Sequence, residues 1–308
     1  MNKLDAFRIF YNHSIYPELK RMEVKRNRVL YLIGFSILLG AILITIAQLL
    51  HIFALSLIIV LLVCFYTAFL FYRIRQYVKT FKPRIMELIL DFIDNSINYS
   101  TLSYEPDRGV GFANFKKSNI FQLSNPDFQE EDYIKGNIGS VAFELAETRV
   151  KNPSKVSGRM EWIFDGVFMK ATLQIPIKGS ILIIPKTEKP YLSRTIKQWV
   201  GAGHVKVNNL IRNPQFRAQF ETYANKKSNP VGFLTEGLQA SILQYTQAFD
   251  KLFYLAYKNG IIYMAISEEK DILEPHLFKS NLKFSLIKEF YDDITILLHI
   301  LEDLDLHH

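Results

Sequence analysis

Two long apolar segments dominate the pattern of hydrophobic and polar positions near the start of the chain. Val29–Leu50 and Ile52–Tyr72 contain no formally charged residue, and only Gln48 and His51 interrupt their apolar character where they meet. At about 1.5 Å per residue, the first segment forms a helix of roughly 33 Å, which is enough to cross a hydrocarbon core of about 30 Å. The pattern predicts two transmembrane helices joined by a very short turn.

Two other interpretations of this apolar block are less favourable. A pair of buried core helices would need a soluble domain large enough to enclose 44 consecutive uncharged residues. A cleaved signal peptide has an apolar region of about 7–15 residues followed by a small-residue cleavage site, and neither feature is present. We therefore expect both helices to remain in the membrane.

The regions on either side of the apolar block follow a helical period. Residues 1–28 mix aromatic and charged positions, which predicts an amphipathic helix broken near Pro17. After the second span, apolar residues continue at helical spacing from Ile85 to Ile93. We predict a basic connecting helix over residues 73–98 that ends near Asn98. Pro83 stands just before the apolar stretch from Ile85 and is interpreted as a first-turn proline of that stretch.

Beyond residue 98 the periodicity changes and strands alternate with helices. Residues 99–135 are rich in Ser, Asn, Asp and Pro, and predict a loop with short extended pieces. The Asn259-Gly260 pair between two β-rich runs predicts a type I′ hairpin. The other predicted strands are Asn137–Val150, Met160–Ile175, Ser180–Pro185, His204–Leu210 and Gln215–Ala224, and the predicted helices are Val231–Phe249 and Asn281–Leu304.

These elements define the fold class and the domain organisation. Strands connected mostly as hairpins, together with a few helices, indicate an α+β fold with a largely antiparallel sheet and a C-terminal amphipathic helix. The chain is thereby divided into a basic amphipathic segment (1–28), a transmembrane hairpin (29–72, with spans 29–50 and 52–72), a basic connecting helix (73–98) and a cytoplasmic α+β domain (99–308).

The positive charge is concentrated beside the apolar block. The net charge is +4 for residues 1–28, zero for 29–72, +5 for 73–84 and −2 for the remainder. A nearly neutral domain lacks the clustered cations that nucleic-acid binding requires, so we expect no nucleic-acid partner. The basic residues that flank the hairpin are Lys20, Arg21, Lys25, Arg26, Arg28, Arg73, Arg75, Lys79, Lys82 and Arg84.

This charge distribution predicts both an orientation and a contact with lipid. Positive residues accumulate on the cytoplasmic side of membrane proteins, so both termini are expected in the cytoplasm. The same side chains are available for contact with anionic lipids, although the requirements of membrane insertion alone explain their presence.

Small residues in the first span suggest close helix packing. Ser36 and Gly40 lie four residues apart on one helical face, and Ala47 lies two turns further along. Small side chains allow membrane helices to approach closely. The pattern is compatible with packing inside the hairpin and with a homo-oligomer.

Several short motifs resemble those of a bacterial membrane protein family, the domain-of-unknown-function 3137 family. They are the N-terminal FRIFYNHSIYPELKRME, then Phe143-Glu144-Leu145 with Thr148, Phe164–Phe168, Ile183-Ile184-Pro185 and Pro214–Tyr223. The chain departs from the pattern at Lys186 and at Asn225–Ser228. The resemblance implies a protein of a bacterial plasma or inner membrane, without an assigned activity and encoded in some genomes near LemA-type membrane proteins. It supplies no catalytic residue.

A search for catalytic or metal-binding patterns gives no assignment. The single cysteine, Cys64, lies inside a predicted span, and no histidine pair has the spacing of a metal site. His204 follows Gly201-Ala202-Gly203, which we interpret as a loop. Glu144 and Glu147 have opposite strand parity and are therefore expected on opposite faces. We predict no cofactor and no catalytic residue.

Two functional hypotheses follow from the sequence. The first is a non-enzymatic, membrane-anchored interaction or scaffold protein whose partners are lipids, another copy of itself or another membrane protein such as a LemA-type protein. The alternative is a membrane-bound enzyme, such as a hydrolase that acts on a lipid or peptide at the cytoplasmic face. A concave site with converging polar side chains would favour the enzyme.

Overall fold

The computed structural model of the chain describes residues 3–95, 99–154, 158–173, 178–187, 190–267 and 275–305. It consists of two compact units, which we call the helical unit and the sheet unit. The helical unit comprises residues 1–92 and 272–290, and the sheet unit comprises residues 93–271 and 291–308.

The helical unit begins with an almost unbroken helical path. Helix α1 (Lys3–Phe10) continues through a π-helical turn (Tyr11–Ile15) into α2 (Tyr16–Leu49). The predicted break at Pro17 is therefore wrong: Pro17 occupies the first turn of α2, where its missing N–H removes no helical hydrogen bond.

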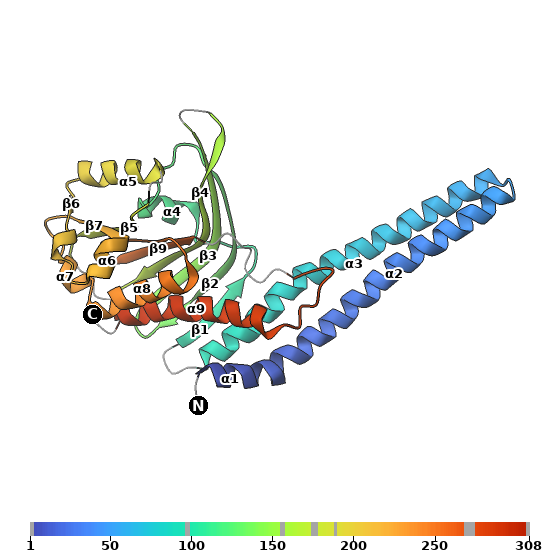
Figure 1. Cartoon of the computed structure of the whole chain (residues 1–308), viewed down its shortest axis with the longest axis horizontal. Coiled ribbons are helices and arrows are strands. Elements are labelled where there is room, and N and C mark those ends of the chain that lie inside the picture. The colour runs from blue at the N-terminus through green and yellow to red at the C-terminus, as the bar shows by residue number, and fades with distance from the viewer. Residues whose placement is uncertain are drawn as a thin grey trace. The chain divides into compact units, whose positions relative to one another are not determined.

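Helix α3 (Phe53–Asp94) runs antiparallel to α2, and a turn with a positive φ of 58° at His51 joins the two helices (Figure 1). Both helices are long and apolar enough to cross a membrane. The predicted boundary between a second span and a separate connecting helix is absent, because α3 is continuous and contains Pro83 in its interior. Asn98, the predicted end of that helix, lies outside the described residues.

The sheet unit is built on one nine-stranded sheet with the order β1-β2-β3-β4-β9-β8-β5-β7-β6 (Figure 1). Every strand pairing in the described residues is antiparallel. The strands are β1 (Tyr99–Glu105), β2 (Asp127–Ile138), β3 (Val141–Pro153), β4 (Met160–Thr172), β5 (Ser180–Pro185), β6 (Val205–Lys206), β7 (Phe220–Ala224), β8 (Phe253–Lys258) and β9 (Ile261–Ser267). The predicted class, an α+β fold with an apolar N-terminal helix pair and a large antiparallel sheet, is confirmed.

Short helices occupy the connections between strands, and a long helix closes the chain. They are α4 (Phe112–Ser118), α5 (Pro190–Gly201), a 3-10 turn (Asn208–Leu210), α6 (Pro214–Gln219), α7 (Pro230–Phe233), α8 (Glu236–Phe249) and α9 (Phe284–Asp305). The division between the two units falls inside α9, after Phe290.

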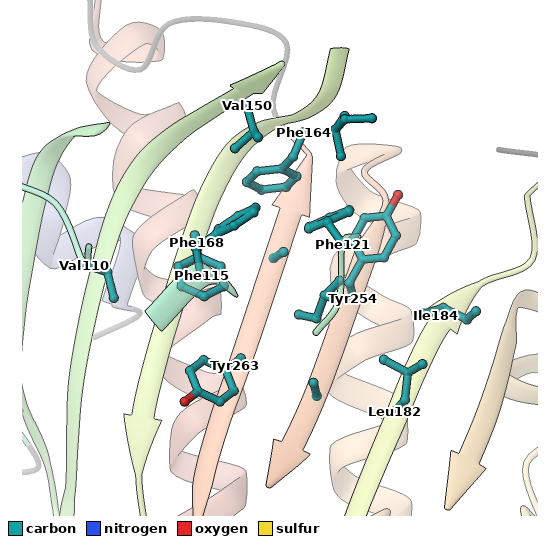
Figure 2. Packing of buried hydrophobic residues seen from close by; sticks show 14 of the residues in the cluster. Val110, Phe115, Phe121, Val150, Phe164, Phe168, Leu182, Ile184, Tyr254 and Tyr263 are labelled. Atoms are coloured by element: carbon teal, nitrogen blue, oxygen red, sulfur yellow. The ribbon is translucent and has the colours of Figure 1, made fainter. Parts of the chain in front are cut away.

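An aromatic cluster on one face of the sheet forms the core of the sheet unit (Figure 2). Phe164 and Phe168 of β4 point to the same side, as the alternation in Phe164-x-Gly166-x-Phe168 predicts. Phe115 of α4 covers them, with its ring centroid 4.8 Å from that of Phe168. Helix α5 adds Trp199, whose indole N–H donates to the Asn119 carbonyl at 2.9 Å.

The predicted Asn-Gly hairpin is confirmed. Strands β8 and β9 pair in continuous register from Phe253–Ile266 to Lys258–Ile261. Asn259 and Gly260 have φ values of 50° and 86°, the positive angles that a type I′ turn requires.

Other local predictions are wrong. Residues 99–135 contain β1, α4 and most of β2 rather than a loop. The predicted strand Asn137–Val150 is instead a hairpin between β2 and β3, since Gly139 turns the chain with φ 52°. In the predicted strand Gln215–Ala224, the first residues form α6, because the Asn213 side chain accepts from the Gln215 and Phe216 N–H groups and caps a helix there. The predicted strand His204–Leu210 keeps only two residues of strand before a 3-10 turn.

Candidate functional site

A cavity of about 760 Å³ lies between α2 and α3, at the level where the uncharged segment meets its basic flanks. Its apolar wall includes Val29, Leu32 and Phe69, and its polar wall includes Arg28 and Arg73. The complete lining is Lys25, Arg26, Arg28, Val29, Leu32, Phe69, Tyr72, Arg73, Ile74, Gln76, Tyr77 and Thr80. The cavity therefore combines positive charge with apolar surface.

Helical periodicity places these residues together. On α2, Lys25, Arg28 and Leu32 follow one another at three- and four-residue steps, so they lie on one face. On α3, Phe69 and Arg73 stand four apart in the same way. A buried contact among Val29, Leu70 and Ile74 holds the two helices together at this level.

Three cations of the cavity are available to a ligand. Lys25, Arg28 and Arg73 have exposed side chains. Within the part of the chain that the structure describes, no carboxylate forms an ion pair with any of the three. A cation without a fixed counter-ion is suited to bind a mobile anion, because no existing ion pair has to be broken.

Arg26 has a different role, since its side chain is 4% exposed. Its guanidinium donates to the carbonyls of His276 at 2.8 Å and Lys279 at 2.5 Å, and it lies 3.4 Å from the Glu23 carboxylate. Arg26 thus attaches the segment before α9 to α2, and its charge is already compensated.

Asn281 connects the same segment to α3. This buried side chain donates to the Tyr77 hydroxyl at 3.1 Å and to the His276 carbonyl at 3.0 Å. The backbone N–H of Asn281 donates to Glu23 at 3.2 Å. Burial raises the pKa of Tyr77, so this wall of the cavity stays neutral at physiological pH. The network fixes Tyr77 before any ligand arrives.

The remaining predicted basic residues lie outside the cavity lining. Lys20, Arg75 and Lys79 are exposed. Arg21 lies 3.8 Å from Glu18, and Arg84 lies 3.6 Å from the same carboxylate and 3.4 Å from Glu87. Lys82 is buried.

The small residues of the first span face the second helix. Ser36, Gly40 and Ala47 are all buried within α2. A Cβ at Gly40 would lie 2.7 Å from the Val63 Cγ2, so the two backbones approach closely at this point. In the helical unit these residues contribute to packing inside the hairpin.

A second polar cluster lies at one end of the sheet, and sequence reasoning missed it. The Ser180 Oγ is 2.6 Å from Nε2 of His204, and the His204 Nδ1 is 2.9 Å from the Trp199 carbonyl. A carbonyl only accepts, so Nδ1 carries a hydrogen and Nε2 of the neutral ring accepts from the serine hydroxyl. Asn225 donates to the same Oγ at 3.1 Å. Burial lowers the pKa of His204 and keeps the ring neutral at pH 7.

A group of carboxylates lies on the other half of the sheet. Oxygen atoms of Glu131, Asp132 and Glu147 lie within 4.8 Å of one another, close enough to share a cation. Arg149 donates to Glu131 at 2.8 Å and also to Glu147. The guanidinium supplies positive charge directly to this group, so we interpret it as an ion-pair network of the sheet.

Comparison with known proteins agrees with the family resemblance seen in the sequence. Residues 162–306 match the model of the family described as "Protein of unknown function (DUF3137)". The chain contains a DUF3137 domain. The DUF3137 match includes the motifs at Phe164–Phe168, Ile183–Pro185 and Pro214–Tyr223, and it does not extend to the motifs before residue 162.

Two further comparisons give no match to the chain. None of the curated proteins matches the chain. None of the solved structures matches it either.

Proposed function

We propose that this protein is a membrane-anchored binding module, which the α2–α3 hairpin holds in a bacterial plasma or inner membrane. The observation that carries the proposal is the apolar surface of the hairpin. Residues 29–72 have no charge, and large side chains such as Leu49, Leu57 and Phe65 are more than 70% exposed. The largest apolar patch on a typical soluble monomer is about 300–600 Å², which two fully apolar helices greatly exceed.

The proposed orientation places both ends of the hairpin in the cytoplasm. Basic residues precede the apolar stretch of α2 and follow that of α3, while the turn at His51 carries no Lys or Arg. Positive flanks favour the cytoplasmic side. The chain enters the sheet unit after the basic end of α3, so the DUF3137 domain is cytoplasmic in this proposal.

We propose a protein partner for the membrane segment as well, either a second copy of the chain or another membrane protein such as a LemA-type protein. An open apolar groove on α2 supports this part of the proposal. It is lined by Val24, Asn27, Arg28, Tyr31, Leu32 and Phe35. Aromatic and aliphatic side chains of this kind provide van der Waals contacts for a neighbouring helix.

Membrane integration is tested by extraction of native membranes at alkaline pH. We expect the protein to remain in the membrane pellet. A reporter fused at His51 should lie outside the cell, and a reporter fused after Asp305 should lie inside it. Leu38→Arg with Leu61→Arg should greatly reduce retention, because each arginine at a helix centre costs about 2.5–3.5 kcal/mol on insertion. Leu50→Arg, at the turn, is the matched control and should be retained. Full release of the wild-type chain would contradict the proposal.

A second candidate function, a hydrolase of esters, is supported by the pair formed by Ser180 and His204. In the proposed step, the Ser180 Oγ bonds to a substrate carbonyl carbon while its proton moves to the His204 Nε2. The leaving alcohol takes that proton, and water then releases the acid by the same route. The Asn225 amide, 3.1 Å from the Oγ, is placed to donate to the developing oxyanion.

A fluorophosphonate probe applied to the full chain tests this candidate. Labelling is expected at Ser180. It should be lost in Ser180→Ala, and its rate should fall about 100-fold or more in His204→Gln. Because burial lowers the pKa of His204, the midpoint at which the rate falls on acidification should lie below pH 6.5, the value of an ordinary histidine. Ser124→Ala is the control, since Ser124 bonds to Asn152 rather than to a histidine. Absence of labelling would exclude the hydrolase and leave Ser180 as a structural contact.

A further inference from the structure

We infer that the cavity between α2 and α3 binds the headgroup of an anionic phospholipid. The inference rests on the proposed membrane anchoring and adds a ligand class to it. The volume of the cavity, about 760 Å³, falls within the range of about 300–1,000 Å³ that is usual for small-molecule sites.

The polar half of the cavity matches a phosphodiester. Arg28 on α2 and Arg73 on α3 present two planar guanidinium groups, each able to donate two parallel hydrogen bonds to phosphate oxygens. Lys25 adds a third cation one turn before Arg28. A ligand with a net negative charge is favoured over a zwitterion, because the choline group of a zwitterionic lipid would bring a positive charge beside these side chains.

The apolar half indicates that the ligand is an amphiphile rather than a soluble anion. Val29, Leu32 and Phe69 line the cavity on the side of the uncharged segment. Acyl chains that leave the headgroup in this direction continue along the exposed apolar surface of the hairpin. Basic pockets between membrane helices on the cytoplasmic side are known to hold lipid headgroups in this manner.

The floor of the cavity is fixed before binding. Two residues of the lining, Arg26 and Tyr77, are held by groups outside it. Arg26 donates to the carbonyls of His276 and Lys279 and lies beside the Glu23 carboxylate, and the Tyr77 hydroxyl accepts from the Asn281 side chain. Part of the wall that the ligand meets is therefore preformed, which reduces the entropic cost of binding.

Native mass spectrometry of the full chain, in detergent with equal amounts of phosphatidylglycerol and phosphatidylcholine, tests the inference. We expect retained phosphatidylglycerol in the wild type. Arg28→Gln with Arg73→Gln should lower the preference for phosphatidylglycerol about 30-fold, the effect of two cations near the lipid phosphate. Lys20→Gln with Arg75→Gln removes the same charge from the same two flanks outside the cavity, so it should keep a preference close to that of the wild type.

The outcomes separate the site from general charge and from membrane anchoring. An equal loss in both double variants, or no preference in the wild type, would overturn the cavity as a lipid site. Displacement of the lipid by an equal concentration of glycerol phosphate would assign the site to a soluble phosphoester instead. Retention in alkaline-extracted membranes is measured on the same variants, so a failure of anchoring is recognised independently.

Discussion

Replacement of Phe168 with alanine is expected to lower the free energy of unfolding of the sheet unit by about 3–5 kcal/mol, the usual cost of removing a fully buried phenyl ring. Phe168 is 0% exposed and its ring contacts Phe115 of α4 and Tyr263 of β9, with centroids 4.8 and 6.2 Å away. The cavity left behind lies between a helix and two neighbouring strands (Figure 2), where the backbone hydrogen bonds of the sheet limit collapse.

Denaturant unfolding of the full chain, followed by tryptophan fluorescence, measures this effect. Trp162 and Trp199 are the two tryptophans of the sequence, and both belong to the sheet unit, so the signal reports on that unit. Met160→Ala is the control on the same strand: this side chain is 47% exposed, and its loss should change the unfolding free energy by less than about 1 kcal/mol. Equal effects of the two substitutions would contradict the assignment of Phe168 to the core.

The parts of the fold that could be predicted are those that local chemistry determines. An uncharged run of 44 residues has few alternatives to paired long helices, and Asn259-Gly260 supplies the two positive φ angles of a tight hairpin. The alternation of Phe164, Gly166 and Phe168 predicts a shared face in the same way. In each case a short stretch of sequence contains the whole physical cause.

Prediction failed where a residue's neighbours lie far away in the sequence. Residues 127–135 are polar enough to suggest a loop, but most of them pair with β3, and Glu131 and Arg149 neutralise each other across the two strands. Pro83 is tolerated inside α3, although local rules favour it in a first turn. The cap by Asn213 is a local exception: its partners are two and three residues away, but the β-rich residues after it dominate the pattern and predict a strand.

The candidate sites show the same limit. The basic flanks of the hairpin could be read from the sequence, but the cavity forms only when the antiparallel pairing brings Arg28 and Arg73 to one level. The contact of Ser180 with His204 joins residues 24 positions apart, and Asn225 reaches them from a third strand. The spacing of these residues follows no known motif, so only the order of β5, β7 and β6 in the sheet could have revealed them.

Replacement of Arg149 with methionine is expected to destabilise the sheet unit by about 3 kcal/mol. Glu131 and Glu147 lie directly opposite each other on β2 and β3, an arrangement of like charges that is unfavourable by itself. The Arg149 guanidinium donates to both carboxylates and lies 3.6 Å from Asp165 on β4. Removal of one partner of a buried ion pair costs about 3–5 kcal/mol, and we expect the lower end because 27% of the Arg149 side chain is exposed.

A series of variants at this position separates charge from geometry. Arg149→Lys keeps the charge but loses the planar fork, so it should recover only part of the stability. Glu147→Gln added to Arg149→Met removes the charge that becomes uncompensated, and the double variant should therefore be more stable than Arg149→Met alone. Lys170→Met removes a single ion pair between β4 and β3, 3.5 Å long, whose Glu144 carboxylate is 36% exposed where that of Glu147 is 4% exposed. The carboxylate left behind is solvated, so this change should cost less than about 1 kcal/mol. If instead Arg149→Met is tolerated as well as Lys170→Met, the carboxylates are held by another cation, and binding of a divalent metal by Glu131, Asp132 and Glu147 would then have to be measured directly.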